Sequence, residues 1–203
     1  SETWEIPQKG DEDQWVRTNP EKLTSLSSEM NAAHGGYYVP TVKLLRQTRR
    51  SILGAGKKPG GFFVEAATYQ AFASGRVSGN DHAEFYVSAL KEVSKIIDGY
   101  VSYGIGVNDP TLPGQTISIR ATDEELDAAK ARFADAAVTA REALDDEQDE
   151  GKAALAFQKL LGKNGDDETV FPMPPGFNED GSKRASAISA GARTVPAGTR
   201  TFG

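Results

Sequence analysis

The hydrophobic residues of this chain recur at intervals of three or four, which is the spacing of an amphipathic helix. The clearest stripe consists of Leu126, Ala129, Phe133, Ala137, Ala140 and Leu144. Similar patterns, bounded by capping residues, prolines and glycines, predict six helices. They are expected at 20–33, 40–53, 62–74, from about 81 through 97, 122–144 and 151–161. We therefore predict an all-α fold, a bundle of about six helices.

Short polar signals mark where these helices begin. Asn19 precedes a proline, the pairing of a cap residue with the first helical position. Asn80 or Asp81 is expected to cap the fourth helix, and Thr122 with Glu125 forms a capping box before the fifth. The helix starts are therefore better defined by the sequence than the loops between them.

The chain divides into three parts. Residues 1–18 hold two tryptophans, Trp4 and Trp15, among polar residues, and we expect an extended lead-in that packs by these aromatics. Residues 19–162 carry the helices and form one helical lobe. Within it, turn residues predict a short strand or hairpin near 115–120.

Residues 163–203 are rich in Pro, Gly, Ser, Ala and Thr and hold few large apolar groups. Such a segment buries too little apolar surface to offset the entropy lost on ordering. We predict a linker and a flexible C-terminal tail. Phe171, Met173 and Phe177 are expected to dock on the lobe before the tail leaves it.

Composition excludes several classes of protein. The chain has no cysteine, so thiol catalysis, disulfides and cysteine-based zinc sites are ruled out. Two histidines, His34 and His82, make a histidine-rich metal site improbable, and we expect structural roles for both. No apolar run approaches the ~18 residues of a membrane span, and the first residues do not resemble a secretory signal. We predict a cytoplasmic protein that does not enter a membrane.

Charge is unevenly distributed. The chain has a net charge of −6, yet no acidic residue occurs from Met30 to Val64, a segment with a charge of +6. The rest of the chain therefore carries −12, much of it between 121 and 150, where eleven acids face three bases. This segregation indicates a surface that meets an anion. The alternative is that the basic segment pairs with the acidic helix of the same domain.

Within the basic segment, Lys43, Arg46 and Arg50 fall in one 60° sector of the second predicted helix, at 100° per residue. We call these three residues the basic ridge. Lys57 and Lys58 follow just past the end of the helix. Arginine forks and lysine ammonium groups on a rigid helix suit phosphate, and a compact patch favours a nucleoside triphosphate (NTP) over duplex DNA. All five residues are candidate phosphate ligands.

The order of motifs resembles the C-terminal half of bacterial nucleotidyltransferases related to cyclic GMP-AMP synthase and oligoadenylate synthetase. That family has a helix reading roughly l-l-K-x-W, a loop, and a helix reading roughly S-y-h-l-E. Here VKLLRQTRR precedes GKKPGGFFVEAATYQAF. A DP turn (NDPTLPGQ) and a long alanine-rich helix follow, and QWVRTNPEKL matches the opening. The resemblance covers about 10–160.

The resemblance implies the helical lobe of a cyclic oligonucleotide synthase of antiphage signalling, acting on NTPs with Mg²⁺. This chain departs from the family in three ways. Arg46 stands where the family has Lys, and Gly61 where it has Ser, which removes a hydroxyl contact to nucleotide. The Gly-Ser and paired-Asp catalytic lobe is absent, so we expect no catalytic residue, no bound metal and no activity from this chain alone. Its partners would be that missing N-terminal lobe and NTPs.

The end of the chain carries a second implication of the resemblance. Some family members are conjugated to targets through a terminal glycine by a partner with E1-like and E2-like activities. Gly203, preceded by Phe202, is the corresponding candidate here. A terminus without a β-carbon can enter a narrow adenylation site, and the aromatic can anchor it.

Two other functions remain open. One is a helical adaptor whose basic ridge binds RNA or an acidic protein, which steep salt dependence would reveal. The other is a structural or regulatory bundle that binds neither NTP nor RNA.

Overall fold

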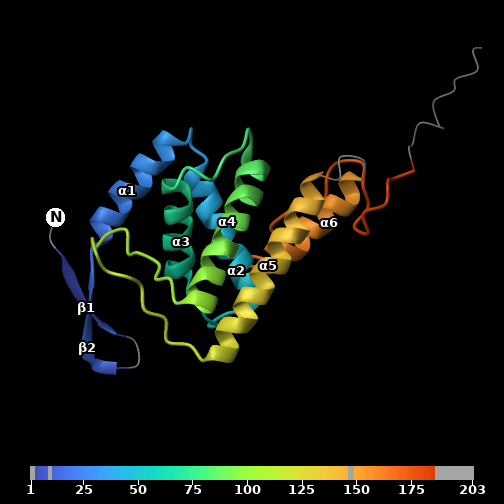
Figure 1. The fold of residues 1–203 in the computed structure, drawn as a ribbon. Coiled ribbons are helices and arrows are strands. Elements are labelled where there is room, and N and C mark those ends of the chain that lie inside the picture. Colours follow the sequence, from blue (N-terminus) through green and yellow to red (C-terminus); the bar gives the residue numbers. More distant parts are fainter. Residues whose placement is uncertain (1–2, 9–10, 146–148, 186–203) are drawn as a thin grey trace, which may run out of the picture.

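The computed structural model describes residues 3–8, 11–145 and 149–185 and shows a bundle of helices preceded by a hairpin (Figure 1). The helices are α1 (Pro20–Ala33), α2 (Tyr38–Leu53), α3 (Gly61–Ala73), α4 (His82–Tyr103), α5 (Asp123–Asp145) and α6 (Glu150–Leu161). The prediction of an all-α bundle of about six helices is confirmed.

The predicted caps account for the helix starts. The side chain of Asn19 accepts from the Lys22 amide at 2.9 Å, and that of Asp81 accepts from the Glu84 amide at 2.9 Å. Thr122 and Glu125 exchange side chain-to-amide hydrogen bonds, each 3.2 Å, as a capping box requires. α2 begins at Tyr38, before the predicted start at 40, because a proline fits within the first turn of a helix.

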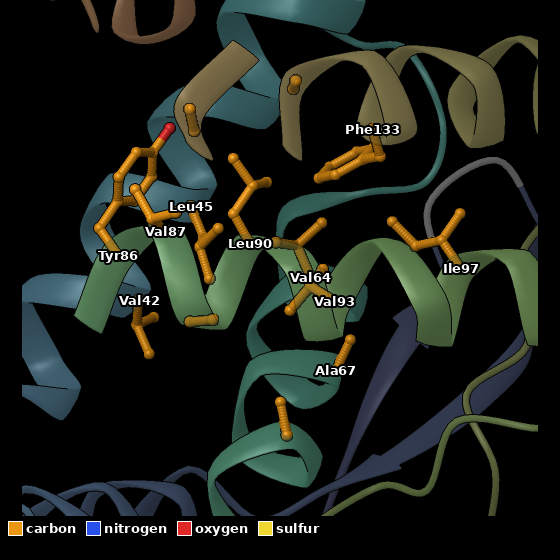
Figure 2. Packing of buried hydrophobic residues seen from close by; sticks show 14 of the residues in the cluster. Val42, Leu45, Val64, Ala67, Tyr86, Val87, Leu90, Val93, Ile97 and Phe133 are labelled. Atoms are coloured by element: carbon orange, nitrogen blue, oxygen red, sulfur yellow. The ribbon is translucent and has the colours of Figure 1, made fainter. Parts of the chain in front are cut away.

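The core is built around α4, which packs against α2, α3 and α5. Leu90 and Val93 of α4 are fully buried and face Leu45 of α2, Val64 of α3 and Phe133 of α5 (Figure 2). α6 closes the far side of the bundle by packing on α2 and α5. None of the described helices is both long and apolar enough to cross a membrane. The packing fixes α2 and α3 side by side, which is what positions the candidate site.

The predicted lead-in is a hairpin of β1 (Trp4–Gln8) and β2 (Asp11–Thr18), paired antiparallel. It is extended, as expected, and its two strands pair with each other along their backbones. Trp4 is 55% exposed, so the expectation that it packs on the lobe is wrong. The side chain of Trp15 lies outside the described part of the structure.

The segment between α4 and α5 forms turns rather than a strand. One bridge pairs Asn108 with Thr116, and the Ile117 amide donates to the Val107 carbonyl at 2.8 Å. The hairpin predicted near 115–120 is thus reduced to this bridge. Two prolines, Pro110 and Pro113, lie in the segment that joins the two bridged residues.

Residues 163–185 fold back on α6 instead of leaving the lobe at once. Phe177 is buried, and Phe171 packs against the core. Gly151 of α6 faces Gly181 so closely that a β-carbon on Gly151 would overlap the Gly181 carbonyl. Small residues therefore allow this turn to dock. Residues 186–203, with the candidate Phe202 and Gly203, lie outside the described residues.

Candidate phosphate-binding site

The basic ridge lies on the exposed face of α2. Lys43, Arg46 and Arg50 are all exposed, whereas Val42 and Leu45 on the same helix are buried. The predicted orientation of the helix is therefore observed. The structure does not, however, gather all five candidate cations in one place.

Arg46 lies over the start of α3. Its guanidinium donates from Nη1 to Glu65 Oε2 at 3.1 Å and forms an ion pair with that carboxylate. A β-carbon on Gly61 would be 3.3 Å from Arg46 Nε. Arg46 thus packs closely on Gly61, and a side chain at position 61 would require the guanidinium to shift.

The first turn of α3 presents free amides beside that guanidinium. The N-cap, Gly60, offers no side-chain hydrogen bond. The earliest α3 amide paired with a backbone carbonyl is that of Val64, which donates to Gly60 at 3.3 Å. The amides before it carry the partial positive charge of a helix N-terminus. Phe62, 39% exposed, stands at the same turn. The Arg46 guanidinium, the helix amides and the Phe62 ring therefore lie close together at the first turn of α3.

Arg49 forms hydrogen bonds with the loop that leads into this turn. It is buried, and its Nε donates to the Pro59 carbonyl at 2.8 Å while Nη2 donates to the Lys57 carbonyl. Burial lowers the pKa of the Arg49 guanidinium from its ordinary value. Arg49 holds the loop between α2 and α3 and so sets where α3 begins. The sequence placed it among the basic residues, although its helical position, 120° from Lys43, lies with the buried side chains.

Lys57 and Lys58 lie at a different place from Arg46. They line a hollow of about 200 Å³ with Glu124 and Glu125 from the acidic first turn of α5. Within the described residues, neither lysine side chain makes a hydrogen bond or ion pair. Part of the basic segment thus faces the acidic helix, as the alternative interpretation of the charge pattern expects.

The other two ridge residues flank Arg46 without joining it. Lys43 lines a shallow hollow with His82 and Val170, which contains no residue of α3. Arg50 makes no hydrogen bond or ion pair with any described residue. Both contribute positive potential rather than fixed contacts to the first turn of α3.

The site has no cluster of metal-ligating side chains beside it among the described residues. Across residues 3–8, 11–145 and 149–185, no three His, Asp or Glu side chains are grouped as a metal site needs. His34 is used structurally, since Nδ1 contacts the Met30 carbonyl at 3.0 Å and the ring meets Phe72 edge-on. Sequence reasoning missed Phe62 and Glu65 as site residues. The signal was present, because both belong to the GGFFVE motif.

The chain matches no family model. It is similar to a "Cyclic AMP-AMP-AMP synthase" from Acinetobacter sp. (strain ATCC 27244 / 9458), at 28% identity over 152 residues. The matched segment is 74% of this chain but 43% of that relative, so this chain spans less than half the length of the relative. The match supports a relation to cyclic oligonucleotide synthases, which is the family that the motif order resembles.

Proposed function

We propose that this chain is the C-terminal helical lobe of a nucleotidyltransferase that makes a cyclic oligonucleotide in antiphage defence. The similarity to a cyclic trinucleotide synthase supports this proposal. So does the placement of two motifs that are separate in sequence, because Arg46 of one lies across Gly61 and Glu65 of the other. In the whole enzyme this lobe would wall the nucleotide pocket.

The observation that carries the proposal is the arrangement at the first turn of α3. Arg46 offers a planar fork of donors that suits phosphate, and the adjacent helix amides favour an anion. Exposed Phe62 offers a face on which a nucleobase can stack. A triphosphate, with its charge at one end and its base at the other, matches these groups. Lys43 and Arg50 would raise the local concentration of the anion.

The chemistry must be completed outside this chain. Mg²⁺ ions in such enzymes stabilise the charge of the transferring phosphate and lower the pKa of the attacking hydroxyl. Among the described residues, no cluster of three or more metal-ligating side chains could hold such ions. Their ligands would come from the N-terminal catalytic lobe. This chain would bind and orient the NTP through Arg46 and the first turn of α3. It would do so in the cytoplasm, where NTPs are made.

The C-terminal glycine belongs to the same proposal. The described structure ends at Ala185, beside α6, after Arg184 Nε donates to the Phe177 carbonyl at 2.9 Å. The following residues would carry Gly203 to a partner with E1-like and E2-like activities, which would join it to a target. Intact mass of the protein from its own cells tests this step, since conjugation adds a fixed mass through an amide bond.

Nucleotide binding by the complete gene product tests the lobe assignment. The double variant Arg46→Glu with Arg50→Glu should lose affinity for a non-hydrolysable NTP by about 100-fold or more, because the charge-assisted contact of Arg46 and the attractive potential of Arg50 both become repulsive. A matched control is Lys91→Glu, an exposed change on α4. Unchanged NTP affinity in the double variant would remove Arg46 and Arg50 from the site. A gene product without paired catalytic carboxylates upstream of Ser1 would end the enzyme proposal.

The exposed ridge also favours a second candidate, an adaptor that binds RNA. RNA binding would weaken steeply as salt rises and would be indifferent to Mg²⁺. NTP binding would instead depend on the number of phosphates. Titrations with a triphosphate and with a single-stranded RNA at two salt concentrations separate the two candidates.

A further inference from the structure

A hollow of about 280 Å³ lies between α3 and α4 and is closed at one end by residues 105–106. It begins at Gln70, nine residues from the start of α3, which places it about 13 Å along the helix from the turn under Arg46. It therefore belongs to a part of the molecule that the proposed function does not use.

The floor of this hollow is apolar and uncrowded. Ala71, Ile96, Gly99 and Ile105 contribute to it. Gly99 lies inside a 22-residue helix, where glycine costs about 1 kcal/mol relative to alanine. A β-carbon there would meet Ile105 at 3.6 Å, an ordinary contact, so packing does not demand glycine. The missing side chain instead widens the hollow.

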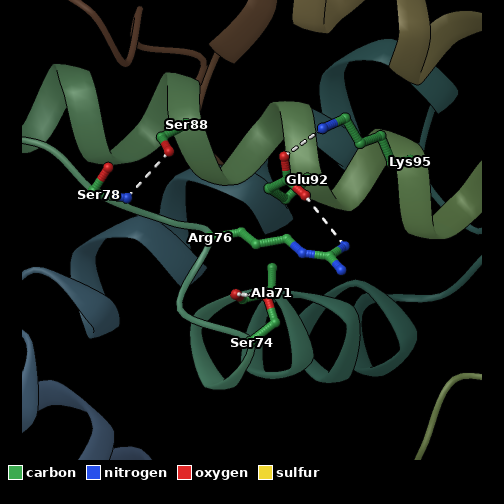
Figure 3. A network of polar contacts seen from close by, with 7 residues as sticks. All are labelled: Ala71, Ser74, Arg76, Ser78, Ser88, Glu92 and Lys95. Carbon is green, nitrogen blue, oxygen red and sulfur yellow. Dashed lines mark hydrogen bonds and ion pairs between the residues drawn. The ribbon is translucent and has the colours of Figure 1, made fainter.

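Charged groups line the rim, and their pairing is unequal (Figure 3). Glu92, whose side chain is 9% exposed, accepts from Lys95 Nζ at 2.6 Å. Arg76 points into the groove beneath the same carboxylate, but its Nη1 is 4.0 Å away, too far for a hydrogen bond. Lys95 therefore makes the close contact to Glu92, and the Arg76 guanidinium keeps only a long ion pair with that carboxylate, with no hydrogen bond to it.

The remaining charge decides what the hollow can accept. Arg76 and Lys95 against Glu92 leave one net positive charge on the rim. An apolar cavity of about 150 Å³ is enough to hold benzene, so this larger space accommodates one or two rings. A guanidinium fork that is 72% exposed at the mouth matches a carboxylate, which it can bind through two parallel hydrogen bonds.

We propose that the hollow between α3 and α4 is a binding site for a small ring-bearing monocarboxylate, with the ring on the Gly99 floor and the carboxylate on Arg76. Ile105, 57% exposed, lies beside Gly99 and would contact the edge of the ring. Lys95 stays with Glu92 and keeps that buried carboxylate from repelling the ligand. The proposal does not depend on the function proposed above.

The test uses indole-3-acetate as the probe and neutral indole-3-acetamide as its matched control, with the 203-residue chain observed by NMR. Indole-3-acetate should shift the amide signals of Ala71, Gly99 and Gly106 and bind at least about tenfold more tightly than the amide, since the charge-assisted bond is lost in the amide. Equal binding of the two probes, or no shift at these amides, would overturn the proposal.

Two variants locate the binding groups. Arg76→Gln, at an exposed position that the fold does not need, should abolish the preference for the carboxylate. Gly99→Leu should fill the floor and abolish binding of both probes, with the fold checked by the remaining amide signals. Lys91→Gln, on α4 but outside the hollow, should change neither. Carboxylate binding that survives both Arg76→Gln and Gly99→Leu contradicts the assignment.

Discussion

An arginine lies beside a glutamate at each end of α3, but the two pairs differ in geometry. At the start of the helix, Arg46 donates to Glu65 at 3.1 Å and is held there. Past the end of the helix, Arg76 Nη1 is 4.0 Å from Glu92 Oε2, whereas Lys95 donates to Oε1 of the same carboxylate at 2.6 Å. The arginine at the start of the helix is thus hydrogen-bonded to its glutamate, whereas the arginine past the end has only a longer ion pair.

The difference has a consequence for ligand binding at each end. A ligand at the first turn of α3 must take Arg46 from Glu65, so part of its binding free energy goes into separating that pair. A ligand at the α3–α4 hollow meets an arginine without a hydrogen-bonded partner. Arg49 adds a further contrast, because it is buried beneath the first turn and serves the fold rather than a ligand.

The largest expected effect is the difference in stability between a variant of buried Arg49 and a variant of exposed Arg46. Arg49→Met keeps the length of the side chain but leaves the Lys57 and Pro59 carbonyls without their donor, so the free energy of unfolding should fall by about 2–3 kcal/mol. Arg46→Met, whose parent side chain is 54% exposed, should change it by less than about 1 kcal/mol. Urea unfolding of both variants measures this. Equal losses would mean that Arg49 does not hold the loop.

The helices were predictable because their signals are local. Caps such as Asn19 and Asp81 bond within three residues of themselves, and apolar spacing selects the buried face. The exposed ridge on α2 follows from the same periodicity. The pairing of the lead-in as a hairpin was not foreseen, because helical spacing does not indicate the register that places Trp4 opposite Thr18.

The site was predicted only in part, because its geometry is not local. Periodicity places Lys43, Arg46 and Arg50 on one face, but only the packing of α2 on α3 brings Arg46 across Gly61. Lys57 follows the same helix and yet faces the acidic start of α5. The hollow beside Arg76 has no sequence signal at all, because Gly99, Ile105 and Gln70 converge only through the turn after α4.

A smaller effect is expected on the free energy of unfolding when either Glu92 or Glu65 is neutralised. Glu92→Gln weakens a nearly buried ion pair with Lys95, and we expect the free energy of unfolding to fall by about 1–2 kcal/mol. The loss stays below that of a fully buried pair because the Lys95 side chain is 57% exposed and keeps its water. Glu65→Gln should cost less than about 1 kcal/mol, since its partner is equally solvated and its own side chain is more exposed, at 15%. Thermal unfolding of the two variants, compared with the parent chain, orders them. A larger loss for Glu65→Gln would reverse the comparison.

The smallest expected effect is a change in NTP affinity when the carboxylate beside each arginine is neutralised. Glu65→Gln removes the charge that competes for Arg46, so the complete protein should bind an NTP analogue about fivefold more tightly, equivalent to about 1 kcal/mol. Glu92→Gln, at the other end of α3, should leave NTP affinity unchanged and serves as the matched control. The gain should shrink as salt rises, because salt screens the exposed Arg46–Glu65 pair in the parent protein. If Glu65→Gln instead weakens NTP binding, the carboxylate orients Arg46 for phosphate rather than competing with it, and the pair at the start of α3 is a positioning pair.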